Sequence, residues 1–313
     1  MLHFPGLHFL ALWLLVRVAG RLPAAALYLG ADIAGTLGWY ASAAVRATTR
    51  DHMRHVLSRG AEGAPSASEV DRAARGAVRS AARYYADFAR TAHLAPGEAF
   101  AEVESFDGIN HYFEASDRGC GVILFSAHVG SPEYIFRSAS YLGLDMVVLT
   151  EVLSPPRVHD FMHAARAVPG VQFVPADGAG LRTVLATLRA GGTVAILGDR
   201  DIQGSGKPVL FFGERAALPS GPVQLALRTH AALIPVAGRR LGPARFSVTM
   251  GAPLELPRSG EREADQAAGM RIFARALEQI IAEAPEQWFA LHPVWSGLGA
   301  GREQPEGGTA GVQ

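Results

Sequence analysis

Short apolar runs alternate with longer helical stretches through the central part of the chain. Five runs have the length and apolar content of buried strands, at residues 122–127, 146–149, 171–174, 193–197 and 233–238. The helical stretches between them, at 132–141, 156–168, 180–190 and 219–230, are long enough to cross over between parallel strands. A later run at 246–250 fits a strand at the sheet edge. The pattern predicts an α/β fold with a mainly parallel central sheet flanked by helices.

The segments before and after this region also have a helical pattern. Residues 68–90 and 261–284 place apolar side chains at helical spacing, and the second of these should cover the sheet. Past residue 297 the sequence is rich in glycine and poor in large apolar residues, as is typical of a loose tail. We therefore expect N-terminal amphipathic membrane-associating helices over residues 1–60, an α/β domain over 61–296 and a disordered tail over 297–313.

The first 60 residues are both apolar and basic. Six arginines against two aspartates give them a net charge of +4. The apolar run at 4–16 is ended by Arg17 and Arg21, short of the ~20 residues that a spanning helix needs. A signal peptide would carry its charge before the run, and here the arginines follow it. We expect this run and residues 22–45 to lie in a membrane interface with the arginines facing lipid phosphates, and a pair of core helices is the alternative.

Composition removes several classes of function. With 49% hydrophobic and 19% charged residues, the chain can bury a large core. Its formal net charge is zero and no basic tract is interleaved with aromatics, which argues against a nucleic-acid partner. Cys120 is the only cysteine, so an intramolecular disulfide and a thiolate zinc cluster are both excluded.

The sharpest candidate for chemistry is the segment SAHVGSPEY at 126–134. It places His128 at the carboxyl end of a strand, where open α/β sheets bind ligands. Ser131 suits the N-cap of the next helix and Pro132 its first position, so Glu133 falls in the first turn. A hydrogen bond from the imidazole to Glu133 would fix the tautomer and leave the other ring nitrogen free to take a proton. From spacing alone, a capping glutamate beside an incidental loop histidine remains the alternative.

Further blocks of sequence extend this motif into a family resemblance. His128, four residues and Glu133 resemble the motif of the bacterial lipid A late acyltransferases and the related phosphatidylinositol mannoside acyltransferases. The resemblance continues in order through GGTVAILGDRD (191–201), FFGERAALPSGPVQLALRTHAALIPV (211–236) and PEQWFALHPVW (285–295). It implies an O-acyltransferase that moves a fatty acyl group from acyl-CoA or acyl carrier protein to a hydroxyl of a membrane glycolipid or lipid A-like acceptor. It implies no cofactor, no metal and no acyl-enzyme, and a peripheral or monotopic place on the cytoplasmic face of the bacterial inner membrane.

The resemblance also assigns roles to residues. His128 resembles the general base that deprotonates the acceptor hydroxyl, and Glu133 resembles its acidic partner. Glu151 and Arg166 resemble an acidic and a basic position near this dyad. A guanidinium at Arg166 suits a phosphate or a tetrahedral oxyanion, because it offers two parallel donors. Surface charges on a helix are the alternative for Glu151 and Arg166.

Four more residues are candidates for substrate binding. Asp199, Arg200 and Asp201 follow the strand at 193–197, at another carboxyl end of the predicted sheet. One of the two aspartates resembles an acidic site residue of the family, and spacing leaves open which one. Arg228 is a candidate for binding the donor, and the block before it should bring residues 219 and 221 to a helix start that suits a phosphate or a carbonyl.

The sequence departs from the family pattern at a few positions. Ser131 and Pro132 stand where relatives often carry Asn-Trp, and His230 stands where glycine is expected, which puts the acceptor in doubt more than the reaction. An α/β-hydrolase would need a G-x-S-x-G elbow, which is missing. A glycosyltransferase would need acidic metal ligands, for which only Asp199 and Asp201 qualify. A non-catalytic lipid-binding protein on the same fold is the remaining alternative.

Overall fold

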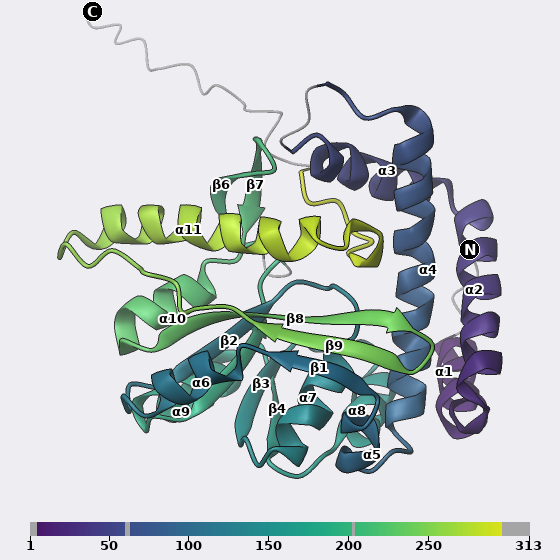
Figure 1. Cartoon of the computed structure of the whole chain (residues 1–313), viewed down its shortest axis with the longest axis horizontal. Helices are drawn as coiled ribbons and strands as arrows, with labels where there is room; N and C mark the ends of the chain where they lie inside the picture. The colour runs from purple at the N-terminus through teal and green to yellow at the C-terminus, as the bar shows by residue number, and fades with distance from the viewer. Residues whose placement is uncertain (1–4, 60–62, 202–203, 296–313) are drawn as a thin grey trace, which may run out of the picture.

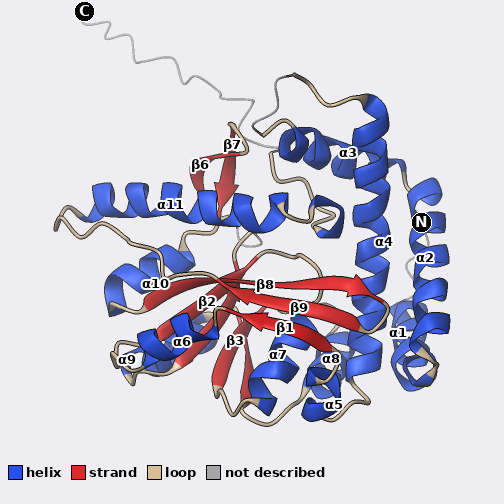
Figure 2. Ribbon diagram, in the orientation of Figure 1, coloured by secondary structure: helices blue, strands red, loops and turns tan. Residues whose placement is uncertain are grey.

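A seven-stranded sheet lies at the centre of the molecule, with helices on both of its faces (Figures 1 and 2). The computed structural model describes residues 5–59, 63–201 and 204–295. The strand order is β1-β9-β8-β2-β5-β3-β4, and every neighbouring pair is parallel except β8 and β9. The strands are β1 (Val103–Asp107), β2 (Val122–Ser126), β3 (Met146–Thr150), β4 (Val171–Pro175), β5 (Thr193–Leu197), β8 (Ala232–Gly242) and β9 (Arg245–Met250). The predicted α/β class and mainly parallel sheet are confirmed.

The position predicted for the strand at 246–250, at the sheet edge, is wrong. The run at 246–250 forms β9, but β9 lies inside the sheet because β1 pairs along its outer side. Residues 103–107 were not predicted as a strand, since VESFD carries two acidic side chains and only half-buried apolar ones. An edge strand of this kind has no continuous apolar run to reveal it.

Two groups of helices cover the sheet. On one face, α6 (Ile109–Ser116) and α7 (Pro132–Tyr141) pack against apolar side chains such as Leu124 and Val148. On the other face, α9 (Gly178–Arg189), α10 (Gly221–Thr229) and α11 (Arg262–Ala282) pack around side chains such as Phe125 and Val194. The crossover helices predicted at 132–141, 180–190 and 219–230 are confirmed as α7, α9 and α10, and the one predicted at 156–168 is confirmed as α8 (Pro156–Arg166). The hairpin of β6 (Lys207–Phe211) and β7 (Glu214–Leu218) was not predicted, and it leads into α10.

The N-terminal helices form a layer at one side of the sheet. They are α1 (Pro5–Arg17), the 3-10 turn η1 (Ala19–Arg21), α2 (Ala24–Ala41), α3 (Ala43–Leu57) and α4 (Ala67–Thr91). Ser66 and Glu69 form a capping box that begins α4, which spans 25 residues and lies between the sheet and α2 (Figure 1). Within residues 5–59, 63–201 and 204–295, no helix combines the length and apolar character needed to cross a bilayer.

Three short helices complete the described chain: α5 (Pro96–Phe100), α8 (Pro156–Arg166) and the 3-10 turn η2 (Pro285–Gln287). α8 packs against α1 and α4, and its His163 lies 3.4 Å from the Thr150 hydroxyl at the end of β3. η2 packs against α4. The tail predicted at 297–313 lies outside the described residues.

Candidate active site

Two neighbouring parallel strands bring His128 and Asp199 together. Ser126, the last residue of β2, pairs with Leu197 of β5, so positions 128 and 199 fall side by side just beyond the ladder. There the His128 Nδ1 lies 2.7 Å from Asp199 Oδ1. A carboxylate only accepts hydrogen bonds, so Nδ1 carries the proton and Nε2 keeps its lone pair. This is the tautomer that a general base requires.

Three donors hold the Asp199 carboxylate, which is fully buried. Besides the ring Nδ1–H, the His128 backbone N–H donates to Oδ2 over 3.0 Å and Trp288 Nε1–H donates to Oδ2 over 2.8 Å. Burial alone would raise the pKa of Asp199, but the His128 imidazole and the hydrogen bonds from His128 and Trp288 hold that pKa below its usual range. Asp199 therefore stays ionised beside the imidazole.

The loop that carries His128 is fixed on both sides. The His128 carbonyl accepts from the Phe289 N–H over 2.8 Å, and the Phe289 ring meets the imidazole edge-on at 5.7 Å between centroids. Gly130 has a φ of +61°, and a Cβ there would lie 1.9 Å from the Gly238 carbonyl oxygen. The chain thus needs glycine to turn sharply between His128 and the start of α7.

The predicted hydrogen bond between Glu133 and the imidazole is not formed, and the contact with Asp199 takes its place. Ser131 and Pro132 do begin α7, with Glu133 in its first turn, although the Ser131 side chain makes no capping bond. From there the buried Glu133 Oε1 accepts from Arg166 Nε over 2.8 Å and from the Tyr84 hydroxyl over 3.2 Å. The first turn of α7 therefore directs this carboxylate toward α8 and α4.

Arg166, Glu133 and Tyr84 form one network, in which Glu133 is buried and the other two are partly buried. Arg166 also donates to the Tyr84 hydroxyl, and its guanidinium lies 5.4 Å from the centre of the Phe88 ring. Burial opposes the charge of Arg166, but Glu133 and Tyr84 raise its pKa above the ordinary value. Burial raises the pKa of Tyr84, so its hydroxyl stays protonated. Tyr84 stacks on Phe289 at 4.8 Å, which links this network to the His128 loop.

The remaining predicted site residues line the same cavity in different settings. Arg200 pairs with Glu151 over 3.8 Å. Asp201 accepts from the backbone N–H groups of Ser205 and Gly206 at 3.1 and 2.7 Å, so it shapes its own loop. The geometry thus separates the two aspartates, because Asp199 contacts the imidazole and Asp201 does not.

Arg228 and His230 lie at the end of α10, and both line the cavity. His230 has a φ of +62°, the left-handed region that favours glycine, which is the residue expected there from the family pattern. Arg228 makes no ion pair among the described residues. The predicted helix start near 219–221 is confirmed, with α10 beginning at Gly221.

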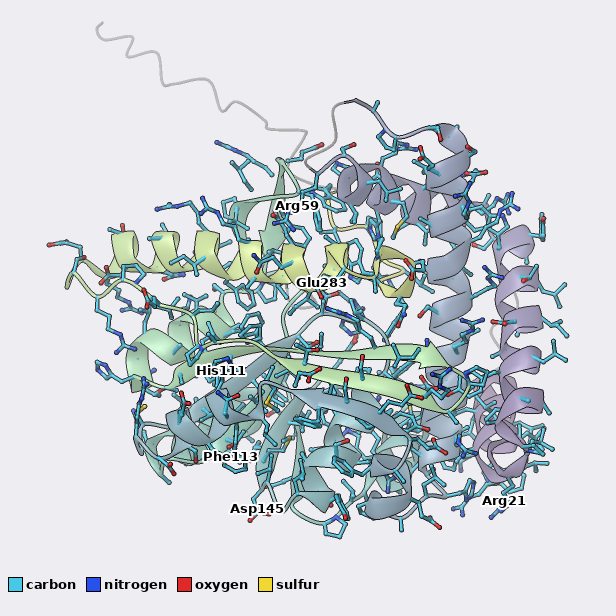
Figure 3. All side chains as sticks on the ribbon, in the orientation of Figure 1. Arg21, Arg59, His111, Phe113, Asp145 and Glu283 are labelled. Atoms are coloured by element: carbon cyan, nitrogen blue, oxygen red, sulfur yellow. The ribbon has the colours of Figure 1, made fainter. Side chains whose placement is uncertain are left out.

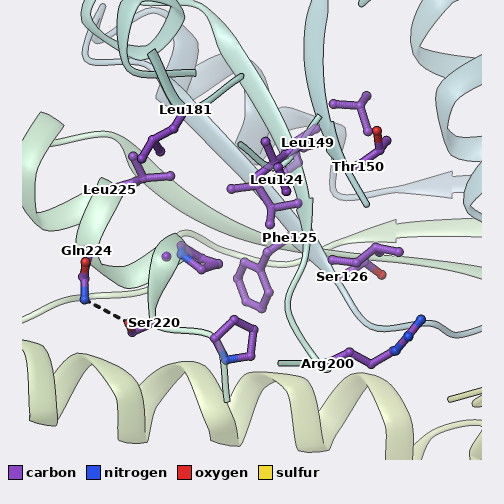
Figure 4. Close-up of a pocket in the computed structure, with 18 of the residues that line it drawn as sticks. Leu124, Phe125, Ser126, Leu149, Thr150, Leu181, Arg200, Ser220, Gln224 and Leu225 are labelled. Atoms are coloured by element: carbon purple, nitrogen blue, oxygen red, sulfur yellow. Dashed lines mark hydrogen bonds between the residues drawn. The ribbon is translucent and has the colours of Figure 1, made fainter. Parts of the chain in front are cut away.

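A cavity of about 1400 Å³ opens at the carboxyl ends of the strands and includes His128 in its wall. β3 and β5 pair only from Met146↔Thr193 to Val148↔Ala195, so the described sheet opens between them beyond that point. Apolar side chains from both faces of the sheet meet at this opening, among them Leu124, Phe136, Met146, Val148, Leu149, Phe173, Leu181, Ala195 and Leu225. Figure 4 shows Leu181 and Leu225 at one end of the pocket and Ser126, Thr150 and Arg200 toward the other.

Sequence reasoning missed three residues of this site. Trp288 and Tyr84 contact the candidate acids directly, and His52 stacks on Trp288 at 4.8 Å between centroids. Burial lowers the pKa of His52 to about 4, so it is neutral at physiological pH. Trp288 lies in the block PEQWFALHPVW, and its only sequence signal was that resemblance.

Comparison with known proteins shows which proteins the chain is similar to. The model of the family described as bacterial lipid A biosynthesis acyltransferase matches residues 6–296. The phosphatidylinositol mannoside acyltransferase of Mycolicibacterium smegmatis is 27% identical over 266 residues, covering 83% of this chain and 84% of that relative. The protein of the same name from Mycobacterium tuberculosis (strain CDC 1551 / Oshkosh) is 26% identical over 241 residues, covering 74% and 73%.

Proposed function

The chain belongs to the bacterial lipid A biosynthesis acyltransferase family and is an acyltransferase, and we propose that it transfers a fatty acyl group from a thioester to a hydroxyl of a membrane glycolipid. In this proposal His128 is the general base and Asp199 orients it. The observation that carries the proposal is the Nδ1 to Asp199 hydrogen bond at the wall of a large apolar cavity. The names of the relatives favour a phosphatidylinositol mannoside as the acceptor class.

The proposed reaction is direct transfer. The acceptor oxygen attacks the thioester carbonyl carbon while its proton passes to His128 Nε2, and the carbonyl π electrons move onto oxygen. Collapse of the tetrahedral intermediate re-forms the C=O bond and breaks the C–S bond. The departing thiolate takes the proton from Nε2, so an ester and a free thiol leave and the ring regains its first tautomer. The ionised Asp199 stabilises the transient imidazolium.

Arg166 is the proposed partner for the negative charge in this step. It lines the cavity, and Glu133 and Tyr84 fix its guanidinium. A preorganised donor of this kind stabilises a developing oxyanion without having to reorient. Glu133 thus acts as a positioning residue in the proposal, through Arg166.

The cavity suits an acyl chain and a charged carrier. At about 1400 Å³ it exceeds the roughly 300–1,000 Å³ of a common small-molecule site. Its basic lining residues include Lys207, Arg228 and Arg262, and none of these three pairs with a carboxylate in the part of the chain that is described. Phosphate groups favour such cations, and both acyl-CoA and acyl carrier protein carry the thioester on a phosphorylated arm. Either carrier remains a proposed donor.

A membrane surface is the proposed source of the acceptor. Large apolar side chains are exposed along one face of α2, with Leu29 and Leu37 each 63% and Ile33 54% exposed. The opposite face of α2 buries Leu27, Tyr28, Ala31, Gly35 and Trp39. An exposed apolar stripe of this size marks an interaction surface, and a bilayer interface matches it.

The test uses purified protein with an acyl thioester and a phosphatidylinositol mannoside. We expect thiol release to match the formation of a lipid heavier by one acyl group, and His128→Ala to lower the rate by about 10²–10⁴-fold or more. His163→Ala is the matched control. His163 lines the same cavity, but among the described residues its Nε2 has a hydrogen-bond contact only with the Thr150 hydroxyl, at 3.4 Å. Equal losses in both variants, or full activity in His128→Ala, would reject the assignment.

A further inference from the structure

A second cavity lies where the end of α1 meets α4 and α8. It measures about 150 Å³, and Arg17, Arg21 and His93 line it together with Phe161, Ala164 and Ala165. No carboxylate is among its lining residues, and neither arginine makes an ion pair within the described part of the chain. The cavity is therefore a small concave site with uncompensated positive charge.

The backbone holds the two arginines at this cavity. His93 Nε2 donates to the Val16 carbonyl over 2.6 Å, which joins the end of α1 to the end of α4. At Gly20 a Cβ would lie 2.4 Å from the Ala89 carbonyl oxygen, so the η1 turn rests directly on the α4 backbone. Arg17 ends α1 and Arg21 ends η1, and Figure 3 shows Arg21 at the margin of the molecule beside these helices.

Exposed apolar side chains lie next to the basic cavity in the chain. Trp13, Leu14, Val18 and Leu22 are between 40% and 56% exposed, and they are followed by the stripe on α2. Guanidinium groups beside an exposed tryptophan and leucines match the two zones of a bilayer surface, because phosphates lie directly above the acyl chains. A free phosphate ion would use the cations and leave the apolar side chains uncovered.

We infer that this cavity binds the phosphate of an anionic membrane lipid through Arg17 and Arg21 while the neighbouring apolar side chains enter the interface. The inference rests on the proposed function in taking a bilayer as the source of the acceptor. α8 connects the site to the chemistry, since Ala164 and Ala165 line this cavity and His163 and Arg166 line the large one. A lipid phosphate held here fixes how the large cavity is turned toward the bilayer.

The first test measures binding of the full chain to vesicles of phosphatidylcholine alone and of phosphatidylcholine mixed with phosphatidylglycerol. At about 1 kcal/mol for each arginine near an anionic surface, Arg17→Gln with Arg21→Gln should weaken binding to the anionic vesicles about 30-fold. Binding to phosphatidylcholine vesicles should change little. The matched control is Arg118→Gln with Arg189→Gln, which removes the same charge near α6 and α9, at the far side of the molecule from α1 (Figure 1). If both double variants lost the same affinity for anionic vesicles, the effect would come from net charge alone, and the proposed lipid site would be rejected.

A second variant separates a shaped cavity from diffuse attraction. Ala164→Leu fills the cavity without changing charge, so it should remove most of the preference for anionic vesicles. Unchanged preference in this variant would overturn the inference. Inorganic phosphate at constant ionic strength should leave the protein on the vesicles, whereas release would assign the cavity to a free ion. A dimer in solution that blocks vesicle binding would assign the surface to a second copy.

An assay of turnover in detergent micelles separates a lipid site from a role of the two arginines in the proposed reaction. With acceptor dissolved in detergent micelles, the double arginine variant should keep wild-type turnover. Lost turnover there would place the arginines in the reaction and not at the bilayer. If the wild-type protein fails to transfer acyl groups at all, the proposed function fails while the vesicle measurements still decide the lipid site.

Discussion

Asp199→Asn is the most informative change, because it alters one atom at the centre of the proposed dyad. The Asp199 Oδ2 accepts two N–H donors, from the His128 backbone and Trp288, and Oδ1 accepts one from the ring. An asparagine amide can satisfy the pair at Oδ2 with its oxygen or the single ring N–H, but not both. At about 1 kcal/mol for each bond, the amide oxygen should keep the two donors.

That orientation directs the asparagine NH₂ group at His128 Nδ1. The ring must then accept at Nδ1 and carry its proton on Nε2, so Nε2 has no free lone pair with which to act as a general base. In the Ser-His-Asp triad this wrong-tautomer change lowers kcat by about 10⁴-fold. We expect a comparable loss here, about 5 kcal/mol in activation free energy, with the fold retained because the volume is unchanged.

The assay is the initial rate of thiol release at saturating thioester and acceptor, with circular dichroism as a check on folding. Asp201→Asn is the control, because among the described residues the Asp201 carboxylate accepts from the backbone N–H groups of Ser205 and Gly206 and not from the imidazole. It should cost about one hydrogen bond of loop stability and less than about tenfold in rate. A kcat for Asp199→Asn within tenfold of wild type, or an equal fall in Asp201→Asn, would refute the tautomer argument.

Three further predictions concern the cavity, pH and the turn. Ala195→Phe narrows the opening between β3 and β5, so kcat/KM should fall about tenfold for long-chain thioesters and little for short ones; equal falls would contradict this. Burial lowers the pKa of His52 to about 4, below the ~6.5 of the unfolded chain, so the stabilisation from the neutral ring is complete above pH ~6.5 and is lost as pH falls. Urea titrations should show the free energy of unfolding falling by about 2 kcal/mol between pH ~7.5 and ~5. His52→Phe should remove that part of the pH dependence of the unfolding free energy. Parallel slopes in the two proteins would count against it. Gly130→Ala would place a Cβ 1.9 Å from the Gly238 carbonyl oxygen at a φ of +61°, so it should lower the free energy of unfolding by more than about 2 kcal/mol. Gly30→Ala is the control, because a Cβ there would meet open space. Similar melting temperatures for the two variants would contradict the predicted strain.

The central strands could be predicted because they are buried on both faces. The run Val122–Ser126 is buried at every position and apolar up to its final serine, and the residues after such a run fall at the ligand-binding edge of a parallel sheet. His128 was found in this way. Its partner was not, because the sequence gives the order of strands along the chain and not their order in the sheet. Local spacing favoured Glu133, five positions away, whereas the register of β2 and β5 sets Asp199 beside the ring from 71 positions away.

Other parts of the site left weaker signals. Trp288 follows a short 3-10 turn, in a segment with neither helical nor strand periodicity, so only coordinates reveal its contact with Asp199. The residues of α2 are apolar on nearly every side, and such a sequence does not say which side faces the protein. The glycine at position 35 lies against the α4 backbone, with Arg79 Cα only 2.7 Å from where a Cβ would be, and this close approach selects the buried face.

The fixed position of the His128 imidazole bears on how the protein could accept a different substrate. Hydrogen bonds hold His128 through its ring, its backbone N–H and its carbonyl, so the ring cannot move toward a substrate hydroxyl. In the proposed mechanism the cavity walls, which other helices and loops form, must therefore position the acceptor hydroxyl. In the proposed mechanism, a different acceptor lipid would therefore require changes in the cavity walls and none in the His128–Asp199 pair.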